Sequence, residues 1–100
     1  MRDHIFHLCT LQSWEAQSDL EDYRHNSLNL EGFIHASKEN QISGVLDRYF
    51  DGINIITVME IDPSLLSPEL KYEMASIGEE FPHIYGPVNK SAIVKVKQIK

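Results

Sequence analysis

The sequence predicts a small α+β (mixed α/β) fold in which about two helices pack on one sheet of roughly four to six strands. Three observations support this prediction. Short apolar runs, either alternating in polarity or rich in β-branched residues, lie at the start, middle and end of the chain. One stretch between them carries apolar residues at helical spacing. At 100 residues the chain has room for a single domain, 1–100, with one core.

The expected elements follow one another along the chain, with turn residues between them. In order they are a strand at 4–11, a helix at 14–20, a polar turn at 23–29, an extended piece at 30–35, a helix at 38–50, a strand at 53–61, an edge strand at 70–74, a loop at 75–82, an extended segment at 83–86 and a last strand at 92–99. The strand at 53–61 is the most β-branched segment, so we expect it at the centre of the sheet.

Side-chain periodicity and capping residues place the first strand and both helices. Ile5, His7 and Cys9 should share one face of the first strand, because successive strand side chains alternate. Ser13 and Ser37 are the expected N-caps of the two helices, since a serine oxygen accepts from the free N–H groups of a first turn. Apolar residues with i, i+3, i+4, i+7, i+8 spacing mark the second helix: Ile42, Val45, Leu46, Tyr49 and Phe50.

Turn residues and alternation also organise the second half of the chain. Asp62-Pro63 opens a turn ahead of the edge strand. In the last strand Val94 and Val96 are expected to face inward, and Lys95 and Lys97 to remain in water.

Composition narrows the class of protein and the kinds of partner. The formal net charge is −6 and the pI is about 5.2, without the clustered positive charge that a phosphate backbone requires, so nucleic acid is a disfavoured partner. No segment approaches the roughly 20 apolar residues of a membrane span, and residues 1–10 lack the apolar core of a secretion signal. Cys9 is the single cysteine, so the cytoplasm is the expected location.

The first candidate site lies in the motif GFIHAS, residues 32–37. Backbone N–H groups at a helix start are unpaired and stabilise anions, phosphate above all. His35 and Ser37 at such a start, with Gly32 allowing close backbone approach, suit a phosphate or pyrophosphate ligand. The alternative is that Ser37 only caps the helix and His35 is a hydrogen-bonded structural residue.

The second candidate site is the motif FPHIYGP, residues 81–87, in which two prolines restrict the chain. His83 and Tyr85 share a face of an extended segment, and both can give or take a proton. The prolines equally suit a rigid turn without function.

Single residues outside the motifs are weaker candidates. His7 is the one polar residue on its apolar strand face, where a histidine is more often a satisfied core residue than a ligand. Glu73 is a carboxylate near the presumed site segments, although Glu31, Glu60 and Glu79 are equally available by type. No metal motif such as CxxC or HExxH is present, so we expect no metal site, and nothing places a base beside Cys9 for nucleophilic catalysis.

The motifs together resemble a known bacterial family. The matching segments are IFHLCT in the first strand, LEGFIHAS, MEID and FPHIYGPVN. They resemble domain of unknown function number 952 over nearly the whole chain. Ala36, Glu31 and Tyr72 depart from the residues most frequent in that family.

The resemblance implies an ADP-ribosyltransferase-like fold, with the RNA 2′-phosphotransferase domain as a remote relative. In that fold a histidine of the first strand contacts a ribose of NAD, which corresponds loosely to His7 with Thr10 nearby. Glu73 is the candidate for the catalytic glutamate, without an unmistakable match.

Two functions follow as expectations. The first is an ADP-ribosyl or phosphoribosyl-type transferase or glycohydrolase, or a binder, acting on NAD, ADP-ribose or a related phosphorylated nucleoside in a cleft lined by histidines. In it His7, His35, His83 and Glu73 would do the chemistry, and Thr10, Gly32, Ser37 and Tyr85 would hold the ligand. The alternative is a non-catalytic binding or interaction module. Whether the protein is an enzyme therefore stays open.

Overall fold

The computed structural model describes residues 3–17 and 20–99. Within them the fold is α+β, and its strands pair antiparallel throughout. The strands are β1 (Ile5–Thr10), β2 (Asp22–Tyr23), β3 (Ile34–His35), β4 (Ile56–Ile61), β5 (Glu69–Met74), β6 (Glu80–Tyr85), β7 (Val88–Asn89) and β8 (Ile93–Ile99). The helices are α1 (Leu11–Glu15), α2 (Asn26–Glu31) and α3 (Ile42–Tyr49), with 3-10 turns η1 (Glu39–Gln41), η2 (Pro63–Leu65) and η3 (Lys90–Ala92).

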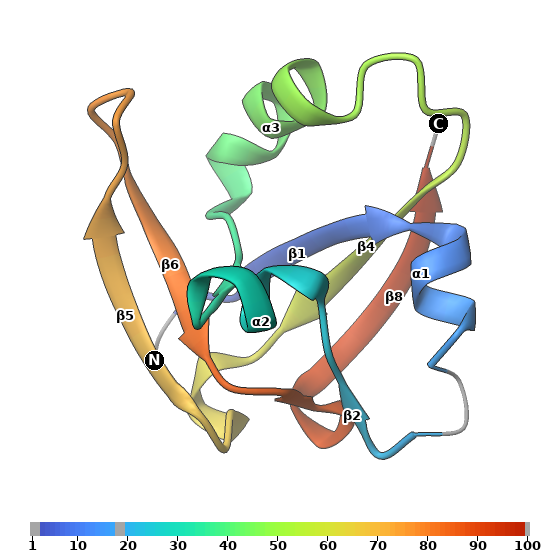
Figure 1. Cartoon of the computed structure of the whole chain (residues 1–100), viewed down its shortest axis with the longest axis vertical. Coiled ribbons are helices and arrows are strands. Elements are labelled where there is room, and N and C mark those ends of the chain that lie inside the picture. The colour runs from blue at the N-terminus through green and yellow to red at the C-terminus, as the bar shows by residue number, and fades with distance from the viewer. Residues whose placement is uncertain (1–2, 18–19, 100) are drawn as a thin grey trace.

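The strands form two three-stranded sheets and a small ribbon. One sheet has the order β1-β4-β8, the other has the order β3-β6-β5, and β2 pairs with β7. Figure 1 shows β5 and β6 as a long hairpin to one side of the strands β1, β4 and β8. The sheets are joined where Phe6 of β1 exchanges two backbone hydrogen bonds with Ser37, at 2.8 and 2.7 Å.

The core is formed by the side chains on the inward faces of both sheets. Its fully buried members include Tyr23, Ile34, Met59, Ile61 and Ile84, each with 0% exposure. They come from β2, β3, β4 and β6, so the interior is closed by contacts between distant segments. No helix in the described part of the chain has the length and apolar character needed to cross a membrane.

Several predicted elements are confirmed. The first strand is β1, and its face of Ile5, His7 and Cys9 is buried. The β-branched segment is β4, which is central in its sheet. The predicted edge strand is β5, and Gly52 ends the α3 region with φ +81°.

The first helix and the segment after it differ from the prediction. Thr10, not Ser13, caps α1: its hydroxyl accepts from the Ser13 amide at 3.1 Å, and the helix ends at Glu15. The polar segment at 23–29 contains the second residue of β2 and most of α2 rather than turns alone. A six-residue helix is too short to show a periodic pattern, and its stability depends on tertiary packing.

The expected N-cap at Ser37 is wrong. Ser37 is held extended by its two bonds to Phe6, and the chain turns only afterwards, through η1 into α3. The α3 helix is also more exposed than its periodicity suggests, since Tyr49 is 72% exposed. The predicted helix is confirmed, but α3 begins at Ile42 instead of residue 38, because Ser37 pairs with β1 and η1 follows it.

The last third of the chain holds two further differences. β6 begins at Glu80 and runs through Pro82, where a loop was expected. Proline lacks a donor, yet the Pro82 carbonyl still accepts from the Ala36 amide at 3.0 Å. In β8, Val94 and Val96 do not face inward: β8 is an edge strand, and these residues are 47% and 37% exposed.

Candidate functional site

The register of the β3-β6-β5 sheet brings the two motifs together. His35 of β3 lies opposite His83 of β6. Because side chains alternate along a strand, His83, Tyr85 and Glu73 share the face that carries His35. We call the following set the histidine cluster: Glu31, Phe33, His35, Glu73, His83 and Tyr85.

Phe33 is at the centre of the rings of the histidine cluster. Its ring stacks on His83, with centroids 4.1 Å apart and an interplanar angle of 19°. The Phe33 ring is also 4.9 Å from His35 and 5.3 Å from Tyr85. The two imidazoles meet edge to face at 5.3 Å. One apolar ring therefore lies in contact range of three polar rings.

Glu73 fixes two of these rings. One oxygen of Glu73 accepts from Nδ1 of His83 at 2.9 Å and also from the Tyr85 hydroxyl. The hydrogen bond from Tyr85, followed by that from His83, lowers the pKa of Glu73. The same bond to Glu73 raises the pKa of Tyr85, because it stabilises the protonated phenol. With Nδ1 engaged, Nε2 is the His83 atom left to exchange a proton or bind a ligand.

Glu31 holds the other imidazole. Its carboxylate lies 2.8 Å from Nε2 of His35, so Nδ1 of His35 remains for a ligand. The His35 and Glu31 side chains are 54% and 49% exposed, whereas the His83 side chain is 10% exposed. The histidine cluster thus has one exposed and one shielded imidazole, each oriented by a carboxylate.

His7 lies behind this cluster, in the core. Its Nδ1–H donates to the His35 carbonyl at 2.6 Å, and its Nε2 accepts from the Tyr23 hydroxyl at 3.1 Å. Burial lowers its pKa to about 4, so the ring is neutral at neutral pH. His7 therefore supports β3 from inside, and its imidazole does not join the exposed rings.

The remaining expected ligand-binding residues lie apart from the rings. The amides of Ala36, Ser37 and Lys38 are all paired, with the Pro82 carbonyl, the Phe6 carbonyl and the Gln41 side chain. The row of exposed amides expected after His35 is therefore occupied by protein partners. Thr10 caps α1.

Gly32 has a different local role. Its amide donates to the Leu28 carbonyl at 3.0 Å, and its φ of +86° turns the chain from α2 toward Phe33. This left-handed conformation is one that glycine adopts without strain.

The sequence pattern did not select Phe33 or Glu31 of the histidine cluster, nor His25, which lies beside His7. Phe33 lies two residues before His35. In an extended segment this spacing places both side chains on one face, so Phe33 could have been selected together with His35. Glu31 was one of several available carboxylates. His25 lies with its ring edge-on to His7 at 5.2 Å, and burial lowers its pKa.

The described residues form no metal centre at the histidine cluster. Among residues 3–17 and 20–99, no group of three or more His, Cys, Asp and Glu side chains could hold a metal ion. Two surface hollows, of about 680 and 280 Å³, are lined by other residues. Cys9 is buried in the core, and burial raises the pKa of its thiol, which disfavours the nucleophilic thiolate.

Comparison with known proteins identifies relatives of the same shape. Residues 8–96 match the family described as Protein of unknown function (DUF952). The crystal structure of protein CC0527 from Caulobacter crescentus, a structural genomics target, has a TM-score of 0.88 at 22% identity, covering 97% of this chain and 86% of that chain. The solution NMR structure of CC0527 has a TM-score of 0.80 at 23% identity, covering 94% and 82%. At these identities the likeness shows the fold alone. No curated protein matches the chain.

Proposed function

This chain belongs to the DUF952 family of proteins of unknown function, and from that premise we propose that its histidine cluster binds a small phosphorylated nucleoside such as NAD or ADP-ribose. The observation that carries the proposal is the convergence of His35, His83 and Tyr85 on one face, with a carboxylate holding each of them. Packing alone does not require several titratable side chains that are each oriented by a carboxylate, and such groups cluster at functional sites.

The chemistry of the rings suits a phosphate next to a planar group. Nδ1 of His35 and Nε2 of His83 are the nitrogens left to face a ligand, and a protonated imidazole donates to a phosphate oxygen. Phe33 and Tyr85 offer partly exposed ring surface for a base or a nicotinamide. Lys71, whose ammonium lies 4.9 Å from the Tyr85 ring centroid, adds positive charge at the rim.

A second candidate function is binding without turnover. Glu73 already accepts two hydrogen bonds, from His83 and Tyr85, so it orients these rings rather than facing a ribose carbon. A glycohydrolase or transferase would need a carboxylate free to stabilise positive charge on that ribose. This observation favours a binding or interaction module over an enzyme.

The finer assignments belong to the same proposal. We keep the ADP-ribosyltransferase-like fold as what the family resemblance implies, and the cytoplasm as the location suggested by a lone cysteine. RNA 2′-phosphotransferase activity is disfavoured, because a chain with a net charge of −6 offers little attraction to RNA.

Calorimetric titration of NAD, ADP-ribose and ADP tests the binding. The wild type should bind at least one of them, and His83→Ala should weaken that binding at least about tenfold, the usual cost of losing a charge-assisted hydrogen bond. His4→Ala is the matched control, since His4 pairs with Glu60 at 2.6 Å but lies outside the histidine cluster. Absence of binding to the wild type at millimolar ligand, or equal losses in both variants, would contradict the proposal.

Turnover separates the two candidates. Release of nicotinamide from NAD by the wild type, abolished in Glu73→Gln, would establish the enzyme. Binding that persists without release over hours would establish the module.

A further inference from the structure

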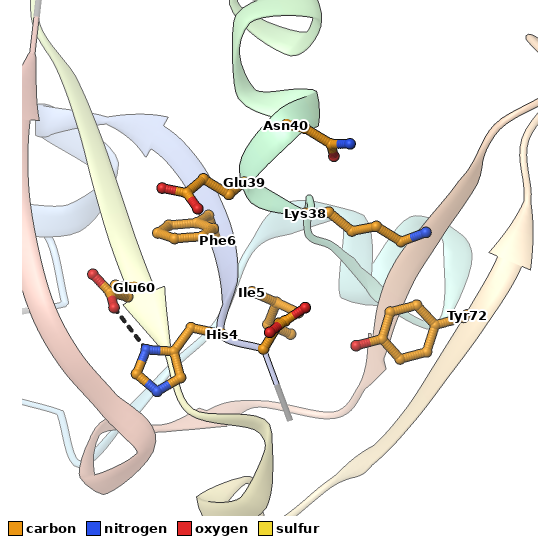
Figure 2. A pocket seen from close by; sticks show the side chains of 9 residues that line it. His4, Ile5, Phe6, Lys38, Glu39, Asn40, Glu60 and Tyr72 are labelled. Carbon is orange, nitrogen blue, oxygen red and sulfur yellow. Dashed lines mark hydrogen bonds and ion pairs between the residues drawn. The ribbon is translucent and has the colours of Figure 1, made fainter. Parts of the chain in front are cut away.

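A groove lies on the face of β5 opposite to the histidine cluster. Tyr72 and Glu73 are neighbours in β5, so their side chains point to opposite faces of the sheet. Glu73 belongs to the histidine cluster, whereas Tyr72 lines a groove of about 680 Å³ between β5 and the start of β1. Figure 2 shows this groove, with Phe6 and Glu39 on one side and Tyr72 across from them.

We propose that this groove binds an organic ammonium compound, that is, a protonated amine carried on an apolar or aromatic body. Its volume lies within the range of small-molecule sites, about 300–1,000 Å³. Its lining mixes the apolar surfaces of Ile5, Phe6 and Tyr72 with charged side chains. Such a lining can hold an apolar body while charged groups orient its polar end.

The charges in the groove select a cation. Asp3, Glu39 and Glu60 contribute three carboxylates, against the ammonium of Lys38 and the imidazole of His4, which pairs with Glu60. The Lys38 ammonium lies 3.7 Å from a Glu80 oxygen and 5.9 Å from the centroid of the Tyr72 ring, so its charge is at the Tyr72 side of the groove and is partly offset by Glu80. The groove therefore presents a surplus of negative charge to a ligand.

Glu39 is a carboxylate available to that ligand. Within the described residues no hydrogen bond or ion pair engages its side chain, whereas Glu60 is bonded to His4 at 2.6 Å. Figure 2 places Glu39 above the ring of Phe6, with Glu60 on the same side of the groove. An ammonium group between these carboxylates would also lie near an aromatic ring, which attracts cations.

The proposed amine and its body occupy different parts of the groove. The ammonium lies at Glu39 and Phe6, and the apolar body extends toward Tyr72. A bare metal ion fits less well, because no group of three metal-ligating side chains occurs in the part of the chain described. The site is independent of the nucleoside proposal, since the two lie on opposite faces of the β3-β6-β5 sheet.

Three probes with one phenylethyl body and different charge test the proposal: phenethylamine, 2-phenylethanol and 3-phenylpropionate. Amide shifts in ¹H–¹⁵N correlation spectra of the full chain report where each binds. Phenethylamine should shift the amides of Phe6, Glu39 and Tyr72 with a Kd on the order of millimolar, as expected for so small a ligand. The alcohol should bind at least about threefold more weakly, and the carboxylate should not bind.

Matched variants test whether the Glu39 carboxylate binds the ammonium group. Glu39→Gln removes one exposed carboxylate at constant shape and should weaken phenethylamine binding about threefold to tenfold. Glu15→Gln, an exposed carboxylate on α1, should leave it unchanged. A dispersed spectrum of each variant verifies folding. The proposal is overturned if phenethylamine shifts none of these amides at its solubility limit, if the carboxylate binds equally well, or if Glu39→Gln has no effect.

Discussion

At the scale of single residues, the buried polar side chains of this protein have hydrogen-bond partners inside the core. His7 and Tyr23 are both buried, and burying an unpaired polar atom is costly. The Nδ1–H of His7 donates to the His35 carbonyl, which leaves Nε2 as the acceptor for the Tyr23 hydroxyl. No described side chain that is buried has a polar atom without a partner. The buried imidazole thus links β1, β2 and β3.

Tyr23→Phe tests this buried network. The ring volume is kept, but Nε2 of His7 loses its donor, so the free energy of unfolding should fall by about 1–3 kcal/mol. Urea denaturation at pH 7 measures the change. Tyr85→Phe is the control: its hydroxyl binds the partly exposed Glu73, and we expect a loss of no more than about 0.5 kcal/mol. Equal losses in both variants would contradict a special role for the buried pair.

At the scale of elements, close backbone approaches define how the strands connect. Gly86 follows β6 and lies against the turn that precedes β5. A Cβ at Gly86 would lie 2.7 Å from Cβ of Pro68, closer than real Cβ atoms approach one another. The glycine of the FPHIYGP motif is therefore required by packing, whatever the motif does chemically.

Gly86→Ala should destabilise the protein by about 1–3 kcal/mol through this overlap. Pro68→Gly removes the opposing Cβ, so in that background Gly86→Ala should cost at least about 1 kcal/mol less. Thermal or urea unfolding of the four proteins in this cycle measures the coupling. A coupling energy near zero would show that the cost has another origin.

At the scale of the whole molecule, burial of His7 makes stability depend on pH. The pKa of His7 is lowered from its ordinary value of 6.5 to about 4, so between these values the unfolded chain binds a proton that the folded chain does not. Stability is therefore fully present above pH 6.5 and is lost as the pH falls toward 4. His25, whose pKa is also lowered, acts in the same direction, whereas the raised pKa of the partly exposed His4 opposes it.

The free energy of unfolding should be about 2 kcal/mol lower at pH 5 than at pH 7 because of His7. Urea denaturation at both values measures this difference. His7→Asn keeps a donor near the His35 carbonyl but cannot titrate. The variant should be less stable at pH 7 and show a much smaller change with pH. An unchanged pH dependence in His7→Asn would assign the effect to other groups.

Local patterns identified much of the fold. Alternation located β1, β-branching located β4, and Asp62-Pro63 located the turn ahead of β5. The interpretation failed where a partner distant in the sequence controls the backbone. Ser37 is drawn into pairing with Phe6, which removes it as a helix cap. α2 is too short to show a period, and only its tertiary surroundings stabilise it.

The sequence by itself determined the family, the principal strands and the two motifs that carry the exposed histidines. Only the tertiary structure decided that His35 pairs with His83 and that Glu73, among several glutamates, binds both His83 and Tyr85. It also placed His7 in the core and a separate groove behind Tyr72. The reason is physical: periodicity and turn residues act between neighbours along the chain. Register between strands and the choice of a hydrogen-bond partner depend on contacts that exist only after distant segments have packed together.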